Sequence, residues 1–146
     1  MPELLKLASE AIYQGYFNAT YCLNPLPTHD GIQVRFNRSN FKHCTYESSK
    51  RDGKKDVFSP QRAERLGWIK AALANPDLTL YAGWIKERQC YDHKSRVTMM
   101  VDDFIVVIRL KSSTEADFVT SYVADSPKTK SKILSSPIWK NPYSEA

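Results

Sequence analysis

Three short blocks of this sequence hold side chains that could act together on a phosphodiester. His43 lies in NFKHCTY, Arg62 and Arg65 lie in FSPQRAERL, and Thr120 and Tyr122 lie in TSY. RNA carries its own nucleophile, the 2′-hydroxyl. An enzyme therefore needs a group to take that proton, a group to protonate the leaving 5′-oxygen, and cations for the charge on phosphorus. Histidine suits either proton transfer because its unperturbed pKa is about 6.5.

The remaining candidates would position RNA rather than react with it: Lys42, Lys54, Lys55 and Ser121. None of the candidates is specific by itself. A lone histidine such as His43 is more often structural, Tyr122 on the inner face of a strand is by default a core residue, and a basic loop is by default solvated. A second catalytic histidine is missing, so the proton donor would be Tyr122 or a lysine.

The composition is that of one ordinary globular domain with a basic surface. The 146 residues are 42% hydrophobic and 25% charged, and the net charge is +5. The default interpretation is a solvated basic surface that binds no particular partner. The more specific interpretation is a surface that binds nucleic acid. The distribution favours the second, because cations crowd one segment: Arg35, Arg38, Lys42, His43, Lys50, Arg51, Lys54 and Lys55, followed by Arg62 and Arg65.

Several other functional classes fit the sequence poorly. Asp102–Asp103 is better interpreted as a solvated turn than as a two-metal site, and the Gly-rich phosphate loops are missing, so we expect no metal and no cofactor. Three widely spaced cysteines indicate a reducing compartment rather than disulfides, and a cytoplasmic protein is expected. The longest apolar run, 104–108, is too short to cross a bilayer, so no membrane partner is expected.

The N-terminal half must position the histidine and the arginines. Periodicity predicts a helix over 2–21, a turn over 23–31 and a strand over 31–36. Residues 37–57 are mostly polar and charged and show no period, and 48–56 within them are predicted to form a loop. Residues 58–73 are predicted to form one amphipathic helix, with Ser59 as its N-cap and Pro60 at its first helical position. Arg62 lies at the mouth of its apolar face. It either extends to solvent or points at a ligand, and we favour the ligand.

The pattern of the C-terminal half predicts strands over 78–86, 95–101, 104–110 and 116–123, with a turn at 102–103. The tail is predicted to form a short helix and then to lie on the surface. On the last strand, alternation places Ala116, Phe118, Thr120 and Tyr122 on one face. The predicted fold class is α+β, with N-terminal helices packed on an antiparallel meander of about four strands. It forms a single domain: 1–30 helix and turn, 31–125 core, 126–146 tail.

The order of these blocks resembles the prophage-associated branch of the barnase/EndoU/colicin/RelE-like (BECR fold) nucleases. The resemblance covers residues 32–125. It is carried by F-x-H at 41–43, F-S-P-x-R-A-x-R-L-x-W-I at 58–69, a helix end at Asn75–Pro76–Asp77, F-I-V-V-I at 104–108 and A-D-F-V-T-S-Y at 116–122.

The resemblance implies a toxin or phage-encoded RNase that leaves a 2′,3′-cyclic phosphate, often on tRNA, and a cognate antitoxin or immunity protein. His43 would match the histidine of the first block, Arg62 or Arg65 the basic helix residue, and Thr120 and Tyr122 the hydroxyl residues of the last strand. Two alternatives stay open. One is a non-catalytic RNA-binding protein that uses the same basic face. The other is a phage structural or protein-interaction module that docks through the basic loop.

Overall fold

A curved sheet organises the chain. The computed structural model describes residues 1–50, 55–77, 79–85, 88–124 and 126–139, with the backbone alone at 84–85 and 91–95. The described strands form one six-stranded sheet in the order β1-β2-β8-β7-β6-β5 and a separate two-stranded pair. The large sheet contains β1 (Leu26–Pro27), β2 (Gln33–Arg35), β5 (Leu80–Ile85), β6 (Cys90–Val101), β7 (Phe104–Leu110) and β8 (Glu115–Val123).

The predicted α+β class and the four-strand meander are confirmed, and the sheet is larger than predicted. β5, β6, β7 and β8 pair in antiparallel succession. β2 then adds to β8 in parallel, and β1 adds to β2, so the sheet is mixed rather than purely antiparallel. β7 is central as predicted, because Phe104 to Ile108 are all buried.

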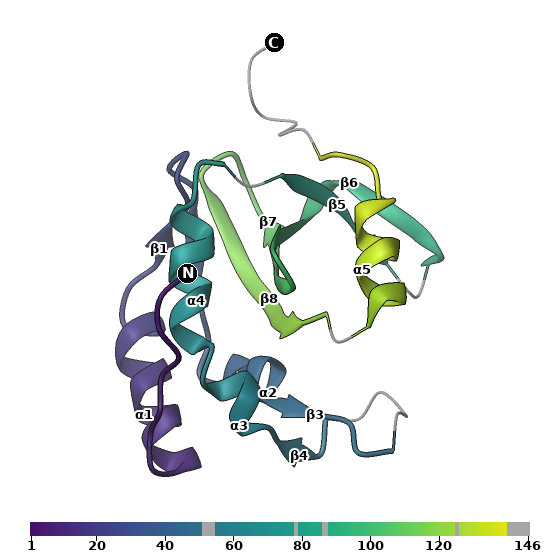
Figure 1. The fold of residues 1–146 in the computed structure, drawn as a ribbon. Coiled ribbons are helices and arrows are strands. Elements are labelled where there is room, and N and C mark those ends of the chain that lie inside the picture. The colour runs from purple at the N-terminus through teal and green to yellow at the C-terminus, as the bar shows by residue number, and fades with distance from the viewer. Residues whose placement is uncertain (51–54, 78, 86–87, 125, 140–146) are drawn as a thin grey trace.

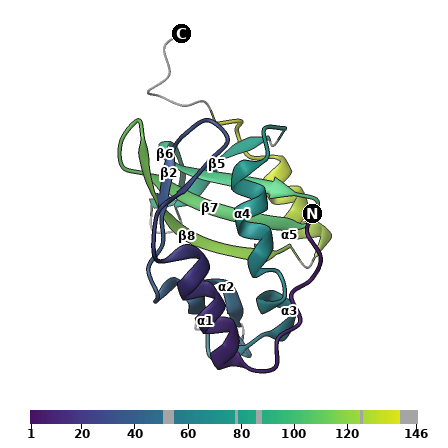
Figure 2. The ribbon, with the colours of Figure 1, turned by 90° about the vertical axis from the view of Figure 1, so that its left-hand side faces the viewer.

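Two helices cover one face of the sheet, α1 (Glu10–Tyr21) and α4 (Leu66–Ala74) (Figures 1 and 2). α1 begins eight residues after the predicted start at Pro2, because Ser9 accepts the Ile12 N–H at 3.3 Å and caps it. The segment before Ser9 instead runs beside α4, where the Leu5 N–H donates to the Glu64 carbonyl at 2.8 Å.

The predicted central helix over 58–73 is divided into two. Its start is confirmed: α3 (Pro60–Ala63) has Ser59 as N-cap, and the Ser59 side chain accepts the Arg62 N–H at 3.3 Å. The chain then turns at Arg65, whose φ of −100° and ψ of 11° are not helical, and α4 begins at Leu66. The predicted end near residue 74 is confirmed. The break separates Arg62 and Arg65 onto different elements.

The polar segment 37–57, for which no helix or strand was predicted, contains regular structure. It forms the short helix α2 (Asn40–Thr45) and the strand β3 (Tyr46–Glu47), which pairs with β4 (Val57–Phe58). α2 forms because Phe41, Cys44 and Thr45 lie at helical spacing and are all buried. Lys54 lies outside the described residues.

A β-bulge in β8 corrects the predicted facing of its side chains. The pairing with β7 runs from Ile108–Phe118 to Val107–Thr120, so Val119 is the extra residue. Ala116 and Phe118 pack in the core beneath α1 and α4, whereas Thr120 and Tyr122 lie on the opposite face with Val107 and Ile105. Strict alternation had placed all four on one face.

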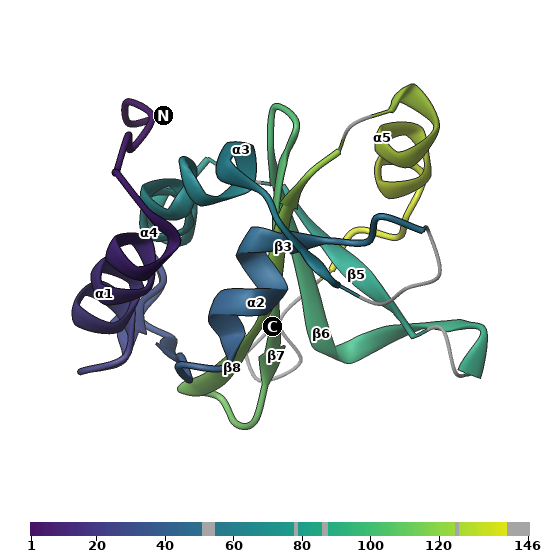
Figure 3. The same ribbon diagram turned by 90° about the horizontal axis from the view of Figure 1, so that it is seen from below.

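The last described helix, α5 (Pro127–Leu134), lies on the other side of the sheet from α1 and α4 (Figures 1 and 3). Its Ile133 packs on a small second core formed by Ile105 and Val107. The predicted short helix is therefore confirmed. The predicted surface tail is wrong for residues 137–139, which pair with β5: the Trp139 N–H donates to the Leu80 carbonyl at 2.9 Å, and the large Trp139 ring is buried in the main core. We call this side of the sheet the α5 face; it carries Thr98, Ile105, Val107, Thr120 and Tyr122.

Every helix in the described part of the chain is too short or too polar to span a bilayer.

Candidate functional site

The main-chain carbonyl of His43 gathers three donors from distant parts of the chain. The Arg62 Nη2 donates to it at 3.0 Å, the Thr120 Oγ1 donates to it at 2.9 Å, and the Lys55 Nζ also donates to it. His43 lies in the last turn of α2, where carbonyl groups lack helical partners. The carbonyl therefore fixes an ammonium, a guanidinium and a hydroxyl at one point.

Arg62 also joins this end of α2 to β3 and β8. Its Nη2 donates to the Ser121 carbonyl at 2.6 Å, and its Nη1 donates to the Tyr46 carbonyl. The Nε of Arg62 is buried and has no hydrogen-bond partner among the described residues. The guanidinium therefore uses three N–H groups on main-chain carbonyls and places a fixed positive charge beside β8.

A cavity of about 420 Å³ opens beside these groups, and we call it the Lys55 cavity. Lys55 and Arg62 are the cationic residues that line it, Thr120 and Tyr122 line it from β8, and Glu47 is its acidic residue. No described carboxylate comes within ion-pair distance of Lys55 or Arg62. Two adjacent cations beside a cavity favour an anionic ligand.

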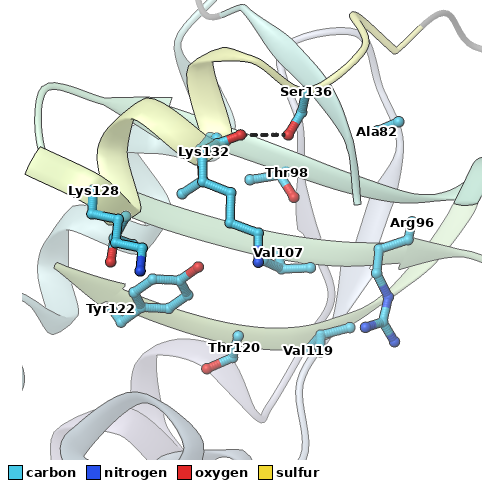
Figure 4. Close-up of a pocket in the computed structure, with 12 residues that line it drawn as sticks. Ala82, Arg96, Thr98, Val107, Val119, Thr120, Tyr122, Lys128, Lys132 and Ser136 are labelled. Atoms are coloured by element: carbon cyan, nitrogen blue, oxygen red, sulfur yellow. Dashed lines mark hydrogen bonds between the residues drawn. The ribbon is translucent and has the colours of Figure 1, made fainter. Parts of the chain in front are cut away.

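Two further cavities adjoin the Lys55 cavity. The His43 cavity, of about 400 Å³, is lined by His43, Lys55, Thr120, Arg96 and Arg109, together with Asn40, Phe118 and Val119. The α5 cavity, of about 500 Å³, lies between α5 and the sheet (Figure 4). Thr120 lines all three cavities. The three cavities therefore adjoin one another at Thr120, and we refer to them together as the groove.

The groove is strongly basic. Its described lining residues include one carboxylate, that of Glu47, and the following cations: Lys55, Arg62, Arg96, Arg109, Lys128 and Lys132. We call this surface the basic groove.

Burial and mutual repulsion shift the pKa values in the basic groove. Partial burial of the ammonium, and then the charge of Arg62, lower the pKa of Lys55 to about 8. Partial burial and then Lys55 lower the pKa of His43 below its usual 6.5, so the imidazole is neutral at pH 7. Burial raises the pKa of Tyr122, with Arg62 opposing, so the phenol keeps its proton. A neutral imidazole and a protonated phenol thus lie near two cations.

The structure brings together four of the five residues predicted to be catalytic. Arg62 and Thr120 donate hydrogen bonds to the carbonyl of His43. Tyr122 lines the Lys55 cavity, and His43 lines the cavity next to it. Arg65 does not join them. Its Nη1 donates to the Gln61 carbonyl at 2.6 Å, and its guanidinium lies 5.0 Å from the centre of the Trp68 ring.

The residues predicted to bind substrate are divided in the same way. Lys55 is central to the site, as described above. The Lys42 ammonium lies 5.3 Å from the centre of the Tyr46 ring and lines none of the three cavities. Ser121 is 2% exposed, and its hydroxyl lies against the Cys44 thiol on the core side of β8. Lys54 is outside the described residues.

The sequence reasoning missed Arg96 and Arg109, which are direct cross-strand partners on β6 and β7. Both line the His43 cavity. Like charges directly opposite each other destabilise a sheet, and Asp117 on β8, the other cross-strand partner of Arg109, supplies one carboxylate beside this pair. The sequence did indicate the pairing of Arg96 with Arg109. A hairpin turn at Asp102–Asp103 places residues that are equally distant from it opposite each other, and residues 96 and 109 are equally distant from it. Lys128 and Lys132 on α5 were also missed.

Gly83 makes room for Arg96. A Cβ atom at position 83 would lie 2.1 Å from the Arg96 Cγ and 2.9 Å from its Cβ. The stem of Arg96 therefore crosses the backbone of β5 at close range, and this packing orients the side chain along the α5 face.

The described residues contain no cluster of three or more His, Cys, Asp or Glu side chains able to hold a metal ion.

Comparison of the chain with protein-family models, with curated proteins and with solved structures found no match.

Proposed function

We propose that this protein is a metal-independent endoribonuclease of the BECR type, and that the scissile phosphate binds in the Lys55 cavity. One observation carries the proposal. Lys55 and Arg62 meet on the carbonyl of His43, Thr120 and Tyr122 line the same cavity from β8, and His43 lines the adjoining cavity. This arrangement supplies charge for a phosphate and two proton-transfer groups next to it.

The chemistry needs no group from outside the chain. The neutral imidazole of His43 takes the proton of the 2′-hydroxyl as O2′ attacks phosphorus. The P–O5′ bond breaks, and the phenol of Tyr122 gives its proton to O5′. Lys55 and Arg62 balance the extra negative charge on the phosphoryl oxygens. The products are a 2′,3′-cyclic phosphate and a free 5′-hydroxyl. The Tyr122 phenolate then regains a proton from solvent, and the His43 imidazolium releases one to solvent, which restores both groups.

The arrangement of the elements supports the same proposal. Helices α1 and α4 cover one face of the sheet, and the candidate residues reach the opposite face from β8 and from the α2–α3 region (Figure 3). The sequence blocks that resemble the BECR nucleases supply His43, Arg62, Thr120 and Tyr122. A toxin or phage effector that cleaves cellular RNA, such as tRNA, would also require a cognate antitoxin or immunity protein.

The test is incubation of the purified protein with total RNA in excess chelator, followed by mapping of the fragment ends. We expect fragments that end in 2′,3′-cyclic phosphate with the wild type, and a loss of at least about tenfold in rate with Lys55→Gln. Lys42→Gln is the matched control, because Lys42 lines none of the three cavities. Intact RNA with the wild type would overturn the proposal. Salt-sensitive RNA binding without cleavage would favour the non-catalytic RNA-binding alternative.

A further inference from the structure

The α5 cavity combines an apolar floor with a cationic rim. Ala82, Val107 and Val119 of the sheet and Ile133 of α5 line it with hydrocarbon. Arg96 borders it from β6, and Lys128 and Lys132 border it from α5. In Figure 4 the Lys132 side chain extends from the helix across the cavity toward Val107.

Hydroxyl groups are spaced along the same cavity. Thr98 lies on β6, Tyr122 on β8, and Ser136 just after α5. A flat ring with polar edges would bury its faces against the apolar floor and hydrogen-bond to these hydroxyls, while an attached phosphate would remain near the cations. The cavity volume of about 500 Å³ is within the usual range for small-ligand sites.

The α5 cavity adjoins the Lys55 cavity. Thr120, Tyr122 and Thr129 line both. A phosphate held by Lys55 would therefore have its neighbouring sugar and base beside Tyr122, at the entrance to the α5 cavity.

We propose that the α5 cavity binds one unpaired nucleobase adjacent to the scissile phosphate, so that the substrate is single-stranded at this position. The proposal rests on the endoribonuclease function proposed above. A base within a duplex cannot enter, because α5 and the sheet enclose the cavity on opposite sides (Figure 4). Paired RNA would meet the cationic rim without reaching the apolar floor.

The experiment measures binding of adenosine and uridine 5′-monophosphates, and of inorganic phosphate, to the full chain by NMR titration. A mononucleotide should bind more tightly than inorganic phosphate, because only the mononucleotide fills the α5 cavity. Val107→Phe fills the floor of the cavity and should weaken mononucleotide binding by at least about tenfold, equal to about 1.4 kcal/mol, while phosphate binding changes by less than about twofold.

A second variant keeps the test independent of folding. Lys128→Gln alters only the exposed rim and should weaken mononucleotide binding by about three- to tenfold. Lys70→Gln on α4, which lies on the far side of the sheet from α5, is the matched control and should have no effect.

The outcomes separate this inference from the proposed function. If RNA is cleaved but mononucleotides bind no better than phosphate and Val107→Phe cleaves like the wild type, the inference is overturned and the nuclease stands. If mononucleotide binding is present and sensitive to both variants but RNA stays intact, the base site stands and the catalytic proposal fails. Equal cleavage of duplex and single-stranded RNA would also overturn the inference.

Discussion

The hydroxyl of Thr120 donates a hydrogen bond to the main-chain carbonyl of His43 at 2.9 Å, across 77 positions of sequence. The same hydroxyl lies 3.4 Å from the Lys55 ammonium. Thr120 can do this because the bulge at Val119 returns it to the α5 face after the core-facing Phe118. The bond therefore joins the end of α2 to the strand that carries the candidate hydroxyls.

Thr120→Val tests the importance of this bond, since valine keeps the shape of threonine and removes its donor. We expect a loss of about 0.5–1.5 kcal/mol in the free energy of unfolding, measured by urea denaturation. RNA cleavage should also fall, because Lys55 loses a neighbour that fixes its ammonium. Thr114→Val, at an exposed position before β8, is the control and should change neither quantity. Equal stability of the Thr120 and Thr114 variants would contradict the account.

Arg62 is expected to be more important for folding than an ordinary surface arginine. Arg62→Ala leaves the carbonyls of His43, Tyr46 and Ser121 without this donor, and should lower the free energy of unfolding by about 2–5 kcal/mol. Arg65→Ala loses one carbonyl bond and the Trp68 ring contact, and should cost less than about 1.5 kcal/mol. Chemical denaturation of the two variants checks the difference. Similar losses would show that the three carbonyl bonds contribute little.

The depressed pKa of Lys55 predicts a pH dependence of stability. Between about 8, its value in the folded protein, and 10.5, its usual value, the unfolded chain binds more protons. The contribution of Lys55 to the free energy of unfolding therefore rises with pH through this window. RNA binding should change in the opposite direction and weaken above about pH 8, because the phosphate needs the charged ammonium.

Lys55→Arg isolates that effect, because arginine stays charged throughout the range. Fluorescence anisotropy with labelled RNA should show a nearly flat affinity across pH 8 for the variant and a decline for the wild type. An identical decline in both proteins would assign the titration to another group.

Protonation of His43 is expected to cause the fall of the cleavage rate at acid pH, which is the acid limb of the pH–rate profile. The pKa of His43 is lowered by partial burial and by Lys55, so the neutral base predominates until the pH falls below 6.5. The rate should therefore be flat near neutral pH and fall only in more acid solution. Lys55→Gln removes the neighbouring charge and should move the acid limb toward higher pH. An acid limb that stays in place would remove Lys55 as a cause of the shift.

Tyr122→Phe tests the proton donor without disturbing the fold. The Tyr122 hydroxyl forms no hydrogen bond with the described residues, so stability should change by less than about 0.5 kcal/mol. Cleavage should slow by about 10²–10⁴-fold, as expected for the loss of a general acid. Tyr16→Phe, on α1 away from the basic groove, should cleave normally. Cleavage by Tyr122→Phe at the wild-type rate would transfer the donor role to another group.

Much of the fold could be predicted because its signals are local. The apolar run of β7, the turn at Asp102–Asp103 and the Ser59–Pro60 helix start were each readable from a few neighbouring residues. The short helix α2 was not, because Lys42 and His43 lie between the buried Phe41, Cys44 and Thr45, and six residues give periodicity little room.

The site was less predictable because its bonds are long-range. Arg62 was expected to point at a ligand, yet three of its N–H groups bind carbonyls that lie 16, 19 and 59 positions away. The bulge at Val119 was also invisible, because β8 carries apolar side chains on both faces and so fits either register. Arg65 was grouped with Arg62 by spacing along one helix, and the break between α3 and α4 separates them.

The most direct test compares a short RNA with the same RNA carrying a single 2′-deoxyribose at the cleaved position, both in excess chelator. We predict that the all-ribose strand is cut to a 2′,3′-cyclic phosphate and that the substituted strand stays intact at that position, since its nucleophile is missing. Equal cutting of both strands, or cutting that requires a divalent metal, would contradict the 2′-hydroxyl mechanism proposed for the Lys55 cavity.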